Sequence, residues 1–577
     1  MSIAWSGTVL QRASCNLGPL AVVAPLLEQM DVAAIIDRHL PPDPQREYSH
    51  GQVLRLLLGA RLSQPLALVN VAAWAEESGA EFLWGIPADK LNDDRLGRAL
   101  DALFTQRHSI LASVAAHVVS TFRLPMARLH YDTTPLLFCG VYDSSTAMPD
   151  ELPLPPTTPS ATFPPAHITH GYAVHDAKMI HAGLCSVVDD LGAVPIIGHT
   201  LNGNDNGKTG IAQQCHLLQE YLRPEPLLMI SDRGTYSAAH AARLERVGHH
   251  ILCSVPWGDF KPLFDQHRPR LFWNRASFLS VEQKRRRQSN SALPKEHHEL
   301  AVLRHQITDP DTAEVIPCRL IFVFSSADQK VCQKKRQRDV AKIRHGLERI
   351  AQSLARGHAR CHEPASIHRR VAKLLGKRGA ARYFRWELVP LSAAAQAALP
   401  PPGRGCRRPT HRFVFHYDDR AAQADADDDG YSALVTTAPL TRSADTLFTE
   451  FKQQCYVEQG HHQWKKPLAV RPLFLKSPER IEALVYLLKI ALTAYHLLQR
   501  CYRQAVPDDA PVADRRLTSE SILRAFRVCP LVKESTPLGC VIHPVQLTQR
   551  QRRILERLHF PTPAQTLSRR LPRFPRE

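Results

Sequence analysis

The fold of this chain can be worked out from residues 227–237, LLMISDRGTYS. The apolar run at its start, bounded by turn signals, predicts a buried strand. Asp232 comes at the end of this strand, and Ser237 is a suitable N-cap for a helix that runs to Val247, with Gly248 placed to end it. The stretch therefore predicts a carboxylate at the end of a buried strand, just before a turn and a helix.

Two further carboxylates lie on other predicted elements. Asp132 lies inside the strand-like run LHYDTTPLLF, residues 129–138, and Glu458 lies in a helical stretch that ends at Lys465. Mg²⁺ prefers carboxylate and water oxygens, and two such ions about 3.5–4 Å apart serve the attacking and leaving oxygens in phosphodiester chemistry. We expect Asp132 to bridge two ions, with Asp232 and Glu458 each completing one. Taken singly, each Asp could instead cap a helix or stabilise a turn.

The composition favours a polyanionic partner and a reducing compartment. Lys and Arg (73) outnumber Asp and Glu (55), which gives the 577-residue chain a formal net charge of +18. Such an excess favours DNA or RNA, although a generally basic soluble protein would share it. The 13 cysteines form no Cys-x-x-Cys pair, which fits reduced thiols in the cytoplasm. No stretch predicts a signal peptide or a membrane span, so we expect no membrane partner.

The order of predicted elements is that of an α/β protein with an interrupted RNase H-like core. Three antiparallel strands precede a helix, the strand before Asp232, a second helix and a further strand. Asp232 and Glu458 are 226 positions apart, more than an uninterrupted core needs. We expect a helical N-terminal domain over 1–125, which serves DNA binding or support. The first part of the core covers 126–258, and a mainly β insertion with a basic helix covers 259–440. The second part of the core covers 441–505, and a helical, basic C-terminal region covers 506–577.

Basic residues near these elements are candidates for phosphate contacts. Lys465 lies seven residues after Glu458, which returns it to nearly the same helix face, where it could bind a DNA phosphate or simply form a charge pair on that face. Arg233 follows Asp232 directly. The remaining candidates lie in the basic runs 284–287 and 334–338 and include Lys284, Arg285, Arg286, Arg287, Lys334, Lys335 and Arg336.

Two other metal sites are weaker interpretations. His358, Cys361, His362 and His368 form a cluster, but their spacing matches no standard zinc finger. The pattern Glu458-x-x-His461 could be half of a di-iron site, but no second Glu-x-x-His pairs with it.

Short motifs surround the three carboxylates along the chain. They are Tyr131–Thr134 with Phe138, Gly171-Tyr172, His175-Asp176, Pro195 with Gly198, Gly203-Asn204, Ile230–Gly234, Val457-Glu458 with Lys465, Val470–Phe474, and Arg480–Ala483. Together they resemble the motifs of insertion-sequence transposases of the DDE class, in the group with a β-rich insertion between the second Asp and the Glu. The blocks around Asp232 and Glu458 are the most specific.

The resemblance implies a function and a set of roles. Asp132, Asp232 and Glu458 would be the catalytic residues and would bind two Mg²⁺ ions, for which Mn²⁺ could substitute. The protein would bind double-stranded DNA at the inverted ends of its own element, cut there and join the freed 3′-OH to target DNA. Pairing of two ends implies a homodimer.

The sequence departs from the resembled motif beside the Glu. Phe451 occupies the position of the family's Tyr, and Gln454 occupies the position of its Arg. Two alternatives therefore stay open. The first is a decayed or repurposed DNA-binding protein without catalysis. The second is an RNase H-like metal-dependent nuclease without strand joining.

Overall fold

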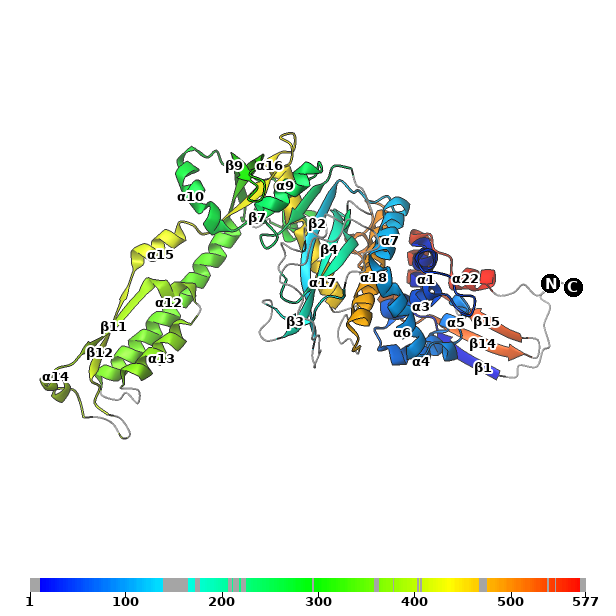
Figure 1. Cartoon of the computed structure of the whole chain (residues 1–577), viewed down its shortest axis with the longest axis horizontal. Coiled ribbons are helices and arrows are strands. Elements are labelled where there is room, and N and C mark those ends of the chain that lie inside the picture. The colour runs from blue at the N-terminus through cyan, green and yellow to red at the C-terminus, as the bar shows by residue number, and fades with distance from the viewer. Residues whose placement is uncertain are drawn as a thin grey trace. The chain divides into compact units, whose positions relative to one another are not determined.

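The computed structural model contains three adjacent parallel strands, two of which, β2 (Arg128–Phe138) and β7 (His250–Val255), are labelled in Figure 1. Strand β6 (Leu228–Ser231) is buried along its whole length and pairs in parallel with both. The strand predicted before Asp232 is therefore confirmed. Its buried apolar run is the pattern expected of a strand that is covered on both faces.

The antiparallel half of the sheet is a hairpin on the other side of β2. Strand β4 (Lys178–Asp189) pairs with β2 and with β5 (Gly192–Asn202), and the short β3 (Thr169–His170) pairs with the start of β4. The three antiparallel strands predicted in this part of the chain are confirmed, and the chain turns between Asp189 and Gly192. Gly192 adopts a φ of 135° there.

The structure describes residues 11–138, 164–171, 177–205, 210, 217–218, 225–292, 295–356, 363–376, 378–401, 404, 407–465, 468, 475–536, 539–544 and 546–570. The chain divides into two compact units. The first contains Met1–Ser254, His305–Cys318 and Val435–Glu577, and the second contains Val255–Arg304 and Arg319–Leu434.

Helices α9, α16, α17 and α18 follow the strands of the first unit. Helix α9 (Ala238–Arg246) begins as predicted, because Ser237 Oγ accepts a hydrogen bond from the His240 backbone N–H at 3.2 Å. The helical stretch predicted around Glu458 and ending at Lys465 is confirmed, and a separate helix precedes it. The chain forms α16 (Ala444–Lys452) and α17 (Gln454–Lys465), because the first helix ends at Lys452 with Gln453 as its C-cap.

Helix α18 (Pro478–Gln504) is the central core helix of the first unit. It packs against β5 and the N-terminal helices, and almost all of its residues are buried. It is long and apolar enough to cross a membrane by length and composition, but the apolar window that meets this test is completely buried inside the protein. This burial is that of a core helix.

The N-terminal region is mainly helical, as predicted, but it also contributes a strand. Its helices are α1 (Leu20–Gln29), α2 (Val32–His39), α3 (His50–Ser63), α4 (Val71–Ser78), α5 (Ala80–Trp84), α6 (Asp93–Thr105) and α7 (Arg107–Thr121). Strand β1 (Gln11–Asn16) pairs antiparallel with β14 (Pro530–Thr536), which pairs with β15 (Gly539–Pro544). We did not predict these strands, and helices α19 (Val512–Arg515), α20 (Ser519–Ala525), α21 (Gln549–Leu558) and α22 (Pro563–Arg570) complete the C-terminal region.

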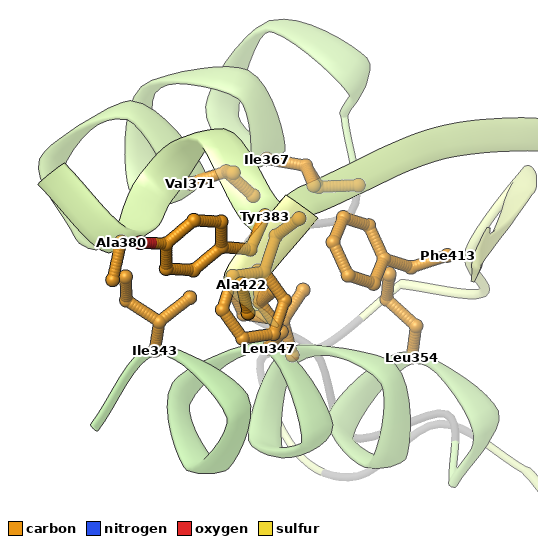
Figure 2. Packing of buried hydrophobic residues seen from close by; sticks show 11 residues of the cluster. Ile343, Leu347, Leu354, Ile367, Val371, Ala380, Tyr383, Phe413 and Ala422 are labelled. Carbon is orange, nitrogen blue, oxygen red and sulfur yellow. The ribbon is translucent and has the colours of Figure 1, made fainter. Parts of the chain in front are cut away.

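The second unit is a mixed α/β structure rather than a mainly β one. Its helices are α10 (Trp257–His267), α11 (Val281–Gln288), α12 (Ser326–Ala355), α13 (Pro364–Leu375), α14 (Ala393–Ala397) and α15 (Asp419–Ala426). Strands β8 (Asn274–Arg275), β9 (His298–Thr308), β10 (Val315–Ser325) and β13 (Tyr431–Thr436) lie in the order β13-β10-β9-β8, and β11 (Phe384–Pro390) pairs with β12 (His411–Tyr417). Figure 2 shows the core that joins α12, α13 and this last hairpin.

Candidate carboxylate site

The register of two parallel strands brings Asp132 and Asp232 to one place. Tyr131 of β2 is paired with Ser231, the last residue of β6. Asp132 follows Tyr131 and Asp232 follows Ser231, so the two residues lie side by side where β6 ends. Two carboxylates 100 positions apart in sequence thus become neighbours at the carboxyl end of β6.

Asp132 is partly buried and is influenced by the two other carboxylates. Burial raises the pKa of its carboxyl to about 7, and the negative charges of Asp232 and Glu458 act in the same direction. A hydrogen bond from the Thr133 backbone N–H to Oδ1, at 2.8 Å, and the charge of Lys465 lower this pKa. The carboxyl of Asp132 therefore lies within the electrostatic influence of the other three charged residues of the predicted site.

Helix α17 places Glu458 and Lys465 at this site. Val457 packs against Val188 and Ala193, beside the turn of the β4–β5 hairpin, and Trp464 is fully buried. A Cβ on Gly460 would lie 3.3 Å from His496 Nε2, so the glycine allows α17 and α18 to approach closely. With this face of α17 held against the core, Glu458 remains exposed.

His461 contacts Asp132 directly. Its Nδ1 lies 3.4 Å from Asp132 Oδ2, and burial lowers the pKa of the imidazole to about 3. The ring is therefore neutral, and the contact is not an ion pair between two charged groups. In the sequence, His461 stands out only as part of the possible di-iron pattern Glu458-x-x-His461. The Glu-x-x-His spacing puts His461 on the same face of α17 as Glu458, but it does not reveal the contact with Asp132.

Gln454, which stands where the resembled transposases have an Arg, has a buried side chain. Its Oε1 lies 2.7 Å from His130 Nδ1, and both residues are almost inaccessible. Burial lowers the pKa of His130 to about 4, so a neutral ring donates to the amide oxygen. This contact ties the start of α17 to β2, two residues before Asp132.

Asp232 and Arg233 lie on an exposed turn. The Gly234 backbone N–H donates to Asp232 Oδ1 at 3.0 Å, and Thr235 Oγ1 donates to the Asp232 carbonyl at 2.8 Å. Asp232 thus stabilises its turn, as one interpretation expected, and still has a second carboxylate oxygen that could bind a ligand. The side chain of Arg233 is exposed.

The weaker metal sites gain no support from the structure. His368 of α13 packs edge-on against Trp386, with ring centroids 4.8 Å apart, and its three companions in the predicted zinc cluster lie outside the described residues. Throughout the described ranges, no group of three or more His, Cys, Asp or Glu side chains is arranged to hold a metal ion. The carboxylates of the candidate site are neighbours without forming a finished coordination sphere.

The remaining basic candidates fall into two groups. In α11, Arg286 and Arg285 lie 2.9 Å and 3.9 Å from Glu282, and all four basic residues of the run are exposed. In α12, Lys334 and Lys335 are exposed, whereas Arg336 donates through Nη1 to Asp429 Oδ2 at 2.7 Å and is mostly buried. Arg336 therefore holds the second unit together at this point.

The comparisons with known proteins are sparse. A family described as a domain of unknown function, DUF4277, matches residues 13–116, which include helices α1 to α6 and much of α7. No curated protein matches the chain. Among solved structures, the chain is similar to a piggyBac transposase, described as a synaptic complex with hairpin DNA, with 10% identity over 98% of this chain and 88% of that one. The TM-score of 0.31 is too low to assign the two chains to one fold.

Proposed function

We propose that this protein is a DNA transposase of the DDE class, with Asp132, Asp232 and Glu458 as its catalytic residues. The observation that carries the proposal is the register of β2 and β6, which makes Asp132 and Asp232 neighbours at the end of β6. Glu458 lies close enough to raise the pKa of Asp132. The strand order β5-β4-β2-β6-β7, antiparallel and then parallel, supports an RNase H-like core.

The donor set suits two Mg²⁺ ions, with Mn²⁺ as a substitute. The negative charges of Asp232 and Glu458 raise the pKa of Asp132, and a hard divalent cation would relieve that repulsion. Once bound, the ions would activate the attacking oxygen and stabilise the leaving oxygen.

The chain's own residues would orient the site and its substrate. Buried His461 contacts the Asp132 carboxyl through Nδ1, 3.4 Å from Oδ2, so it would act as a positioning residue. Lys465 lies on the same helix as Glu458 and carries the charge that a DNA phosphate needs. Arg233 extends the positive charge on the exposed turn beside Asp232.

The substrate would be double-stranded DNA, first the ends of the protein's own element and then a target. The net charge of +18 supports a polyanionic partner, and the reaction would take place in the cytoplasm. Joining two ends would require a homodimer in a paired-end complex.

A cleavage assay tests this function. Wild type, Glu458→Ala and Gln459→Ala are incubated with Mg²⁺ or Mn²⁺ and a duplex that carries the DNA ends flanking the gene. Gln459 is the matched control, because it is the exposed neighbour of Glu458 on α17. We expect metal-dependent cutting by the wild type and the control, followed by joining of the 3′-OH. Glu458→Ala should bind the duplex without cutting it.

Other outcomes select the alternatives. End binding without cutting by the wild type would identify a DNA-binding protein that lacks catalysis. Cutting without joining, at any sequence, would identify a nuclease.

A further inference from the structure

Helix α12 of the second unit has one face committed to packing. Ile343, Leu347, Ile350 and Leu354 recur at intervals of three and four residues and are buried. Figure 2 shows the side chains of Ile343, Leu347 and Leu354 pointing into a core shared with α13 and with Phe413 of β12, and Ile350 belongs to the same cluster. This core fixes the rotation of α12 about its own axis, so the direction of every other residue on the helix is set.

A row of basic residues lies on the opposite face. Lys334, Arg338, Lys342 and Arg349 are exposed, and at 3.6 residues per turn they fall within a sector of about 80°. The centre of this sector is about 150° from the centre of the apolar face. We call these four residues the α12 basic stripe.

The stripe has little internal neutralisation. Residues 326–376 contain thirteen Lys and Arg but only four Asp and Glu. Arg338 Nε lies 3.6 Å from Asp339 Oδ1, whereas Lys334, Lys342 and Arg349 have no carboxylate within ion-pair distance in the described part of the chain. Arg336 provides the contrast, because it lies on the core side of α12 and is paired with Asp429.

We infer that the α12 basic stripe is a binding surface for the phosphate backbone of duplex DNA, on a different unit from the carboxylates. From Lys334 to Arg349 the stripe rises about 22 Å, since each residue of an α-helix adds about 1.5 Å. Duplex DNA presents phosphates over that length on about six base pairs, at about 3.4 Å per step. Point charges on long side chains bind phosphates without reading bases, so the contact is independent of sequence. The choice of DNA as partner rests on the proposed function.

The test is the salt dependence of duplex binding by the full chain, measured in EDTA so that no cutting occurs. The variant is Lys334→Gln/Arg338→Gln/Lys342→Gln. Gln has a helix propensity close to that of Lys and Arg, and all three positions are exposed, so the fold should persist. The control is Arg550→Gln/Arg552→Gln/Arg553→Gln, which removes the same charge from exposed positions of α21 in the first unit.

We expect a loss of counterion release specific to the stripe. Each lost phosphate contact reduces the slope of log K against log salt by about 0.9, so the slope should fall by about 2.7. The affinity lost between about 50 mM and about 200 mM salt should then be about 40-fold smaller than for the wild type. The α21 control should keep the wild-type slope.

Two results would overturn the inference. One is an unchanged slope in the stripe variant with an unaltered circular dichroism spectrum. The other is an equal change in the α21 control, which would show that net charge alone is responsible. Neither result touches the carboxylate site, which Glu458→Ala tests separately. A flattened slope in a protein that does not cut DNA would leave the stripe standing and refute the catalytic proposal.

Discussion

Helices α17 and α12 both carry charges that we propose are functional, but in opposite surroundings. Helix α17 packs on the central sheet, and its Glu458 and Lys465 act on a carboxyl that is itself partly buried. Helix α12 buries one apolar face and displays its charges to solvent. Charges interact more strongly where water is excluded, and exposed charges are screened by salt. We therefore expect changes on α17 to affect chemistry and changes on α12 to affect binding and its salt dependence.

The largest expected effect is on the rate of DNA cutting. Asp232→Asn removes one negative charge at the end of β6 but keeps the turn, because the Asn side-chain oxygen can still accept from the Gly234 N–H. Metal-ion charge stabilisation contributes several kcal/mol, so the loss should be about 1,000-fold or more. Single-turnover cleavage of end DNA measures it, and a variant with near wild-type cutting would remove Asp232 from the site.

The next effect separates stability from chemistry. Leu347→Ala opens a cavity in the core between α12 and α13, where the side chain is fully buried, and should cost about 2–5 kcal/mol. Urea unfolding measures the loss. The exposed Lys342→Gln on the same helix serves as the control and should stay within about 0.5 kcal/mol of the wild type. A similar loss of unfolding free energy in both variants would contradict the assignment of one buried and one exposed face to α12.

A smaller effect is expected at His461. Loss of its contact with Asp132 should lower kcat in His461→Ala by about 10- to 100-fold with little change in KM, as for partners that orient metal ligands. His461→Asn should recover part of the loss, because its amide can occupy the position of Nδ1. A purely structural role would give equal losses in both variants together with a lower Tm.

The smallest expected effect is a difference in stability between variants of two neighbouring residues on α12. Arg336→Gln leaves the buried Asp429 without its partner and should cost about 1–3 kcal/mol, whereas Lys335→Gln should be nearly neutral. Thermal unfolding of the two variants measures the difference. If Lys335→Gln proved the more destabilising, the orientation assigned to α12 would be wrong.

Local chemistry accounts for the elements that could be predicted from sequence. The strand before Asp232 is a run of apolar residues, the β4–β5 turn has Asp189 and Gly192 at its ends, and Ser237 caps α9 with its own hydroxyl. Each of these signals acts within a few residues, so no knowledge of distant contacts was needed. The sequence patterns around Asp132, Asp232 and Glu458 are local in the same sense.

Long-range contacts account for what the sequence did not reveal. Strand β1 pairs with β14, more than 500 residues away, and neither strand has a pattern strong enough to be recognised alone. Arg336 and Lys335 look equivalent in sequence, but the rotation of α12 imposed by its core buries one and exposes the other.

For this protein, sequence was sufficient to identify most elements and to nominate three carboxylates, because strand, cap and turn signals are local. Tertiary structure was needed to show that the register of β2 and β6 makes Asp132 and Asp232 neighbours and that His461 contacts Asp132. It was also needed to show which basic residues of α12 face solvent. Those facts depend on pairing register, helix packing and burial, which arise from contacts between residues far apart in the chain.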